Sequence, residues 1–61
     1  MKQYVIVQTF EDSRDFKLVE CWQSKAHAEG RMCELIEAEN NELIENHCIP
    51  NAGDFFHIEE V

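Results

Sequence analysis

The stretch YVIVQTF, residues 4–10, decides the fold of this chain. Tyr, Val, Ile and Thr favour β-strands. Side chains alternate along a strand, so the odd-numbered residues of this run point one way and the even-numbered residues the other. The run VIV at residues 5–7 is therefore apolar on both faces. That pattern is typical of a central strand that is covered on both sides.

A second strand-like run, FKLVECW, follows at residues 16–22. Only the polar residues 11–15 separate the two runs, which predicts a β-hairpin. No glycine lies between them, so a tight two-residue primed turn is disfavoured and a loop of four or five residues is expected. Simple alternation would place Phe16, Leu18 and Trp22 together on one face of the sheet.

Ser24 marks the start of a helix, because its hydroxyl can accept a hydrogen bond from the backbone two or three residues on. An apolar stripe at helical spacing follows and predicts the inward face of the helix. Its members are Ala28, Met32, Leu35 and Ile36. Gly30 lies inside this pattern and costs about 1 kcal/mol relative to alanine.

The apolar stripe is interrupted at Glu39 and at Asn40-Asn41, then resumes at Leu43. A helix over residues 25–39 is about 22 Å long, which matches a seven-residue strand of about 23 Å. We therefore expect one helix to about Asn40 and a separate short turn through Asn46. The alternative is a helix whose end overhangs the sheet.

Residues 49–54, IPNAGD, predict a loop, and residues 55–61, FFHIEEV, a last strand. A right-handed crossover from the second strand places this last strand beside the first. The predicted fold is α+β, ββαβ: a three-stranded antiparallel sheet of order 2-1-3 with one main helix on one face. Residues 1–61 then form a single small acidic domain.

The bulk composition narrows the classes of function. The chain has 13 acidic and 5 basic residues and a net charge of −8, which disfavours direct nucleic-acid binding. No apolar run approaches the roughly 20 residues of a membrane span. Its three cysteines form no closed disulfide framework and indicate reduced thiols in the cytoplasm. A domain this small buries only about 60% of its unfolded surface, so a partner subunit is a natural stabiliser.

Metal binding and catalysis are weakly supported by the sequence. The metal-ligand candidates have neither Cys-x-x-Cys nor His-x-x-x-His spacing, so no metal or cofactor is predicted. They are His27, Cys33, His47, Cys48 and His57. Cys21 and Cys33 are expected to be small buried hydrophobic residues. No pair of nucleophile and base can be assigned, so the chain is not expected to be an enzyme.

Two surfaces are candidates for binding a protein, either a second copy of this chain or a partner that is basic or has an apolar groove. The first is a set of large aromatic residues that one helix cannot cover, since exposed apolar area marks interaction sites. The second is the acidic helix, which could mimic nucleic acid and block the basic groove of a DNA- or RNA-binding enzyme. Its glutamates scatter around an ideal helix, which weakens this alternative. The candidate partner-binding residues are Tyr4, Phe10, Phe16, Trp22, Phe55, Glu34 and Glu37.

The three segments KQYVIVQTF, VECWQSKAHAEGRMCELI and FFHIEEV resemble small bacterial and phage domains of unknown function. In those domains a hairpin leads into a Ser-Lys-x-x-Ala-Glu helix opening, here residues 24–29, and an acidic strand ends the chain. The resemblance implies a bacterial or phage setting and carries over no active-site residues. Together with the charge, it suggests a non-enzymatic interaction module that inhibits a host protein in the cytoplasm.

Overall fold

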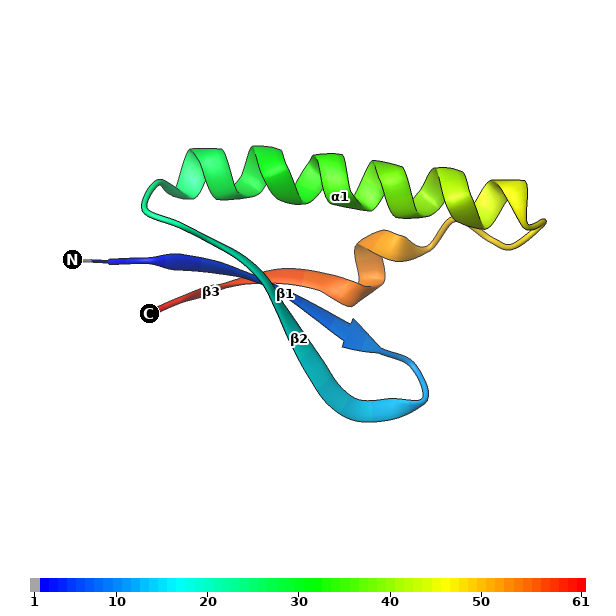
Figure 1. The fold of residues 1–61 in the computed structure, drawn as a ribbon, viewed down its shortest axis with the longest axis horizontal. Helices are drawn as coiled ribbons and strands as arrows, with labels where there is room; N and C mark the ends of the chain where they lie inside the picture. Colours follow the sequence, from blue (N-terminus) through cyan, green and yellow to red (C-terminus); the bar gives the residue numbers. More distant parts are fainter. Residues whose placement is uncertain (1) are drawn as a thin grey trace.

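The computed structural model describes residues 2–61 and shows a three-stranded sheet with one long helix on one face (Figure 1). The sheet is antiparallel throughout, with the order β2-β1-β3. The predicted α+β fold and strand order are confirmed. The elements are β1 (Tyr4–Phe10), β2 (Ser13–Trp22), α1 (Lys25–Glu45), the 3-10 helix η1 (Ala52–Phe55) and β3 (Phe56–Glu60).

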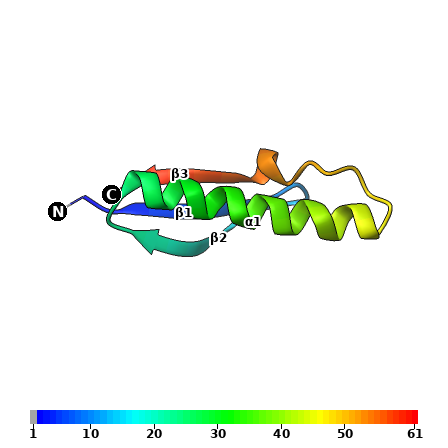
Figure 2. The ribbon, with the colours of Figure 1, turned by 90° about the horizontal axis from the view of Figure 1, so that it is seen from above.

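The core lies between α1 and the sheet and is centred on β1. Seen from above, α1 runs along β1, with β2 and β3 on either side (Figure 2). Ile6 is fully buried and packs in one cluster with Ala52 and Phe56. The predicted apolar stripe of α1 reaches this cluster through Met32, Leu35 and Ile36. Helical and strand periodicities therefore agree on a single core.

A β-bulge in β2 reverses the predicted facing of its side chains. Ile6 pairs with Glu20 but Val7 pairs with Leu18, so Val19 has no partner of its own. An extra residue of this kind shifts the alternation of every residue beyond it. Val19 packs on the core side, whereas Leu18 shares the face of Val7, away from α1. The prediction that Phe16, Leu18 and Trp22 share one face is wrong for this reason.

The hairpin turn is shorter than expected. It comprises only Glu11 and Asp12, because β2 already begins at Ser13, which pairs with Phe10. A second register shift follows, since Thr9 pairs with Phe16. The Ser13 hydroxyl accepts a hydrogen bond from the backbone N–H of Asp15 at 3.0 Å. The polar segment is thus a two-residue turn plus a local irregularity, rather than a loop of four or five residues.

α1 begins as predicted and ends later than predicted. The Ser24 hydroxyl accepts from the backbone N–H of His27 at 3.4 Å, which caps the first turn. The helix then continues without a break through its 21 residues, about 32 Å. The expected end near Asn40 is therefore wrong, and the overhanging end is what the structure shows (Figure 1).

A Schellman motif ends the helix without a glycine. His47 adopts a left-handed backbone with φ of 60°. The N–H of Cys48 donates to the carbonyl of Leu43 at 2.7 Å, and that of His47 to the carbonyl of Ile44 at 3.0 Å. These two bonds satisfy carbonyls that the helix end leaves free.

Asn40 has a different role from the predicted helix end. Its side-chain oxygen accepts from the backbone N–H of Ala52 at 2.8 Å, which fastens η1 to the C-terminal part of α1. η1 then ends at Phe55, so β3 starts at Phe56 rather than at Phe55. This connection brings the chain back from the overhang to the sheet.

Candidate functional site

The face of the sheet turned away from α1 exposes several large apolar side chains. We call it the open face. Within those residues no helix or strand packs on it, because α1 and η1 both lie on the other side (Figure 1). A shallow hollow of about 490 Å³ lies in this face. Its lining residues are Val5, Val7, Thr9, Arg14, Phe16, Leu18, His57, Glu59 and Val61.

Large apolar side chains stand exposed around the middle of the open face. Phe16 is 65% exposed, Leu18 62% and Val61 73%. Val7, at their centre, is only 5% exposed because the neighbouring strands flank it. Since burial of apolar area contributes about 25 cal/mol per Å², covering this face with another apolar surface is favourable.

Charges of opposite sign lie at two corners of the open face. Arg14 is on β2, beyond the pairing of Thr9 with Phe16, whereas Glu59 is on β3 opposite Val5. Because β2 and β3 flank β1 on opposite sides, these two residues are diagonally opposed. His57 Nε2 lies 2.9 Å from Glu59 Oε1 on the same strand. The open face is thus apolar at its centre and polar at its rim, as protein interfaces are.

The predicted aromatic residues do not form one patch. Phe16 is the one of the five that lies on the open face. Tyr4 and Trp22 pair with each other across β1 and β2 on the side of α1. Phe10 and Phe55 line a separate hollow of about 260 Å³ beneath the overhang of α1. Sequence reasoning missed Leu18 and Val61, although the two-sided VIV run pointed to this face.

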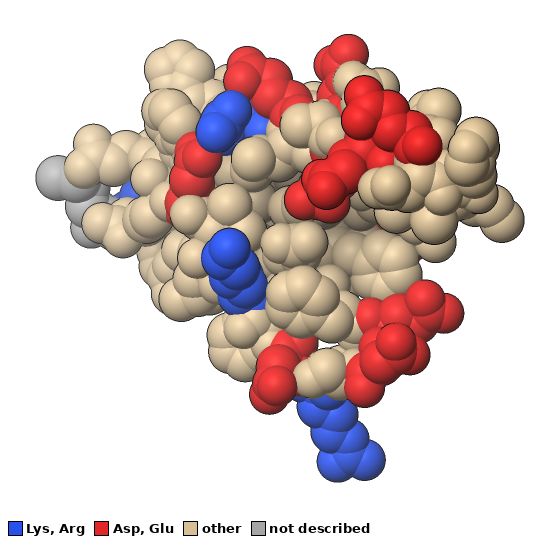
Figure 3. All heavy atoms as spheres, turned by 45° about the vertical axis from the view of Figure 1, so that its right-hand side comes forward, with Lys and Arg blue, Asp and Glu red and all other residues tan. Residues whose placement is uncertain are grey.

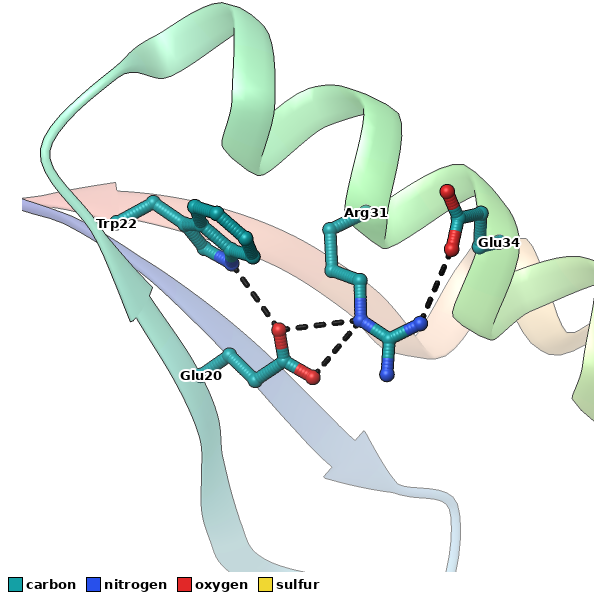
Figure 4. Close-up of polar contacts among 4 residues, drawn as sticks. All are labelled: Glu20, Trp22, Arg31 and Glu34. Carbon is teal, nitrogen blue, oxygen red and sulfur yellow. Dashed lines mark hydrogen bonds and ion pairs between the residues drawn. The ribbon is translucent and has the colours of Figure 1, made fainter.

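Trp22 takes part in a polar link between β2 and α1 (Figure 4). Its indole N–H donates to Glu20 Oε1 at 3.1 Å. Arg31 Nε donates to Glu20 Oε2 at 2.9 Å, and Arg31 Nη1 to Glu34 Oε2 at 3.1 Å. The hydrogen bonds that Arg31 donates to Glu20 first, and then to Glu34, raise the pKa of Arg31 above its usual value. The link fastens the bulged part of β2 to the helix.

The acidic residues of α1 are exposed and lie on the layer opposite the open face. Glu37 has no ion pair within residues 2–61, while Glu34 pairs with Arg31. In the view of Figure 3, acidic side chains form separate groups divided by other residues rather than one continuous row. The six exposed glutamates of α1 are Glu29, Glu34, Glu37, Glu39, Glu42 and Glu45.

The cysteines are arranged differently from the prediction. Cys21, Cys33 and Cys48 are all free and exposed, so the prediction that Cys21 and Cys33 are buried is wrong. In the part of the chain that the structure describes, no three His, Cys, Asp or Glu residues come together as a metal site. The described helices include none long and apolar enough to cross a membrane.

Comparison with known proteins identifies no relative of this chain. Protein-family models, curated proteins and solved structures all give no match to this chain.

Proposed function

We propose that this chain is a non-enzymatic protein-interaction module that binds through the open face of its sheet. The observation that carries the proposal is the exposure of Phe16, Leu18 and Val61 around one hollow. Contiguous apolar surface of this kind marks interaction sites in small proteins. No helix or strand of residues 2–61 packs on this face, which favours its use for binding.

The shape of the molecule supports the same proposal. Its radius of gyration is 12.2 Å, whereas a compact chain of this length has about 10.5 Å. Its shortest extent, 13 Å, runs across the three strands, because α1 lies above the sheet in the view down that axis (Figure 1). A narrow sheet that one helix covers on one face has a small core of its own, which favours a partner on the other face.

A narrower version of the proposal is inhibition of a host protein in a bacterial or phage setting. It is supported by the resemblance of the three sequence segments to bacterial and phage domains and by the net charge of −8. Such a charge speeds the approach to a basic partner. The cytoplasm is the proposed location, because three free thiols persist in a reducing compartment.

Affinity capture with matched variants tests the proposal. Leu18→Asp places a charge in the middle of the open face, and Ile49→Asp places the same charge at an exposed apolar residue on the loop after α1. We expect the unchanged protein and the Ile49 variant to retain the same proteins from bacterial lysate, including untagged copies of this chain. Leu18→Asp is expected to lose them. Equal retention by both variants, or retention by none, would refute the proposal.

The second candidate function is the acidic mimic of nucleic acid. Five of the six exposed glutamates of α1 lack an ion pair within residues 2–61, which favours binding to a basic groove. Binding through charged contacts weakens steeply with added salt. Binding through the apolar open face does not. Capture that is abolished by moderate salt and unaffected by Leu18→Asp would favour the mimic.

A further inference from the structure

We propose that the molecule covering the open face is a second copy of this chain. Two open faces pack against each other about a two-fold axis, forming a six-stranded sandwich with one helix on each outer side. This inference rests on the proposed function and names the partner. Four observations carry it: the exposed area, the placement of charge, the symmetry of the rim and the position of Cys21.

The exposed area of the chain matches what a dimer interface requires. The accessible surface is 4767 Å², whereas a folded monomer of 7.2 kDa exposes roughly 4,100 Å². The excess is roughly 650 Å² on the same scaling. Each partner in a specific complex buries about 800 Å², and the excess of the whole chain, which includes the overhanging end of α1, is of the same order.

The placement of charge permits self-association in this orientation although each copy carries a net charge of −8. The exposed glutamates of α1 lie on the layer opposite the open face. Packing the open faces together therefore keeps the two acidic helices apart, with both sheets between them. Arg14 and Glu59 are the strongly charged residues that line the hollow in the open face.

The rim of the open face is complementary to itself. Arg14 and Glu59 occupy opposite corners, so a two-fold axis in the plane of the interface, perpendicular to the line that joins them, exchanges the two corners. Each Arg14 then meets Glu59 of the second copy, as an interface between identical surfaces requires. Pairs of opposite charge at a rim fix the orientation of an interface. The geometry gives two such pairs around one apolar centre.

Cys21 lies on the face that the two copies share. It pairs with Val5 on β1, so it stands on the open face at the end of β2 away from Arg14. Its thiol is exposed. In the dimer the two copies of Cys21 therefore lie on the facing surfaces of two sheets about 10 Å apart. Cys33 is exposed on α1, on the outer layer.

Sedimentation equilibrium over a range of protein concentrations is the first test. We expect a species of twice 7.2 kDa that dissociates on dilution. Leu18→Asp should raise the dissociation constant by about tenfold or more, the equivalent of 1.4 kcal/mol. Ile49→Asp, with the same change of charge on the exposed loop, should leave it unchanged. A monomer at every concentration, or a dimer insensitive to Leu18→Asp, overturns the inference.

A charge exchange tests the orientation of the two copies. Arg14→Glu and Glu59→Arg should each weaken the dimer, because each creates two like-charged pairs. The double variant should recover the affinity, since the pairs are restored with their signs exchanged. Circular dichroism of each variant establishes that the fold is intact. Additive weakening in the double variant would refute this arrangement of the faces.

Cross-linking through single cysteines tests which faces of the two copies meet. A variant with Cys33→Ser and Cys48→Ser retains only Cys21, and its counterpart with Cys21→Ser and Cys48→Ser retains only Cys33. A short bismaleimide that spans about 10 Å, the separation of stacked sheets, should join the copies of the first variant and not those of the second. Equal cross-linking of both variants, or joining through Cys33 alone, contradicts the proposed packing of the open faces.

The tests separate failure of this inference from failure of the proposed function. If the chain is monomeric while capture from lysate still depends on Leu18, the second copy is refuted and the interaction module stands. If capture is also insensitive to Leu18→Asp, both are refuted. A dimer that depends on Leu18, Arg14 and Glu59 supports both.

Discussion

At the scale of single residues, Asn40 shows how one polar side chain joins two parts of the fold. It is half-buried on α1 and accepts the backbone N–H of Ala52, a residue of the core cluster. Asn41 beside it is exposed. A buried N–H that loses its partner costs about 1–3 kcal/mol, so the two neighbouring asparagines have different consequences for stability.

We predict that Asn40→Ala lowers the free energy of unfolding by about 1–3 kcal/mol relative to Asn41→Ala, the cost of leaving the Ala52 N–H unpaired. Both substitutions gain the same intrinsic helix propensity. The difference between the unfolding free energies of the two variants therefore reports on the hydrogen bond alone. Urea unfolding followed by circular dichroism measures it. Asn40→Asp keeps an oxygen acceptor and should fall between the two. Equal stabilities of the two alanine variants would mean that the bond to Ala52 contributes nothing.

The link among Glu20, Trp22 and Arg31 gives a second prediction at this scale. Glu20→Gln keeps the size of the side chain but removes the charge that Arg31 contacts twice. We expect a lower melting temperature and a change in the fluorescence of Trp22. Glu34→Gln, which affects only an exposed contact three residues along the helix, should change neither, because exposed ion pairs contribute little. A similar response of both variants would contradict the tethering role of Glu20.

The pH dependence of this link has a definite sign. The carboxylates raise the pKa of Arg31 above its usual value. A cation with a raised pKa contributes its stability fully below the ordinary pKa, and that contribution is lost only as the pH rises through the raised one. Arg31 therefore stays charged throughout the neutral range, and its own titration adds no pH dependence to folding there.

At the scale of elements, the periodicity of apolar residues predicted the inward face of the helix. It did not predict the irregularities of the backbone. The stripe of α1 and the alternation in β1 are direct consequences of helical and strand geometry, so the packing of the stripe against the sheet could be predicted from the sequence. The bulge at Val19 has no glycine or proline to signal it. That single extra residue moved Phe16 and Leu18 to the opposite face, so the open face could be predicted only in part.

The end of α1 was missed for a similar reason. Asn40-Asn41 resemble a helix end because asparagine favours turns, but Asn40 bonds to η1 and the helix continues. The actual end uses His47 in a left-handed conformation, a position that glycine usually occupies. Histidine adopts this conformation more often than most residues, but its presence does not predict a helix end. Tertiary contacts, rather than local sequence, decide where this helix stops.

Gly30 provides a prediction for the helix as an element. A Cβ built at Gly30 meets no atom within 4 Å, so the glycine is tolerated there and not required by close packing. Gly30→Ala should stabilise the protein by about 1 kcal/mol, which raises the melting temperature by about 4–8 °C in a domain of this size. The reciprocal change at exposed Ala38, Ala38→Gly, should lower it by a similar amount. Thermal unfolding by circular dichroism measures both shifts, and a Gly30→Ala variant that melts lower would indicate that Gly30 has a role beyond tolerance.

At the scale of the whole molecule, the proposed association contributes to the stability of the fold. Ile6 is the one large side chain that is fully buried among residues 2–61, and a domain this small has little core to spare. The open face offers the apolar area that the single helix leaves uncovered. If a second copy covers it, folding and binding share one free energy.

The last prediction follows from that coupling. A partner that binds only the folded chain stabilises it by mass action, so the melting temperature of a dimer rises with protein concentration. We expect this rise in the unchanged protein and in Ile49→Asp, which alters an exposed residue outside the open face. Leu18→Asp should melt lower and at a temperature independent of concentration, because its folded state gains nothing from a second copy. Differential scanning fluorimetry over a wide dilution series measures all three proteins side by side. A melting temperature that is constant with concentration in the unchanged protein would show that its stability resides in the single chain, despite the apolar side chains that the sheet exposes.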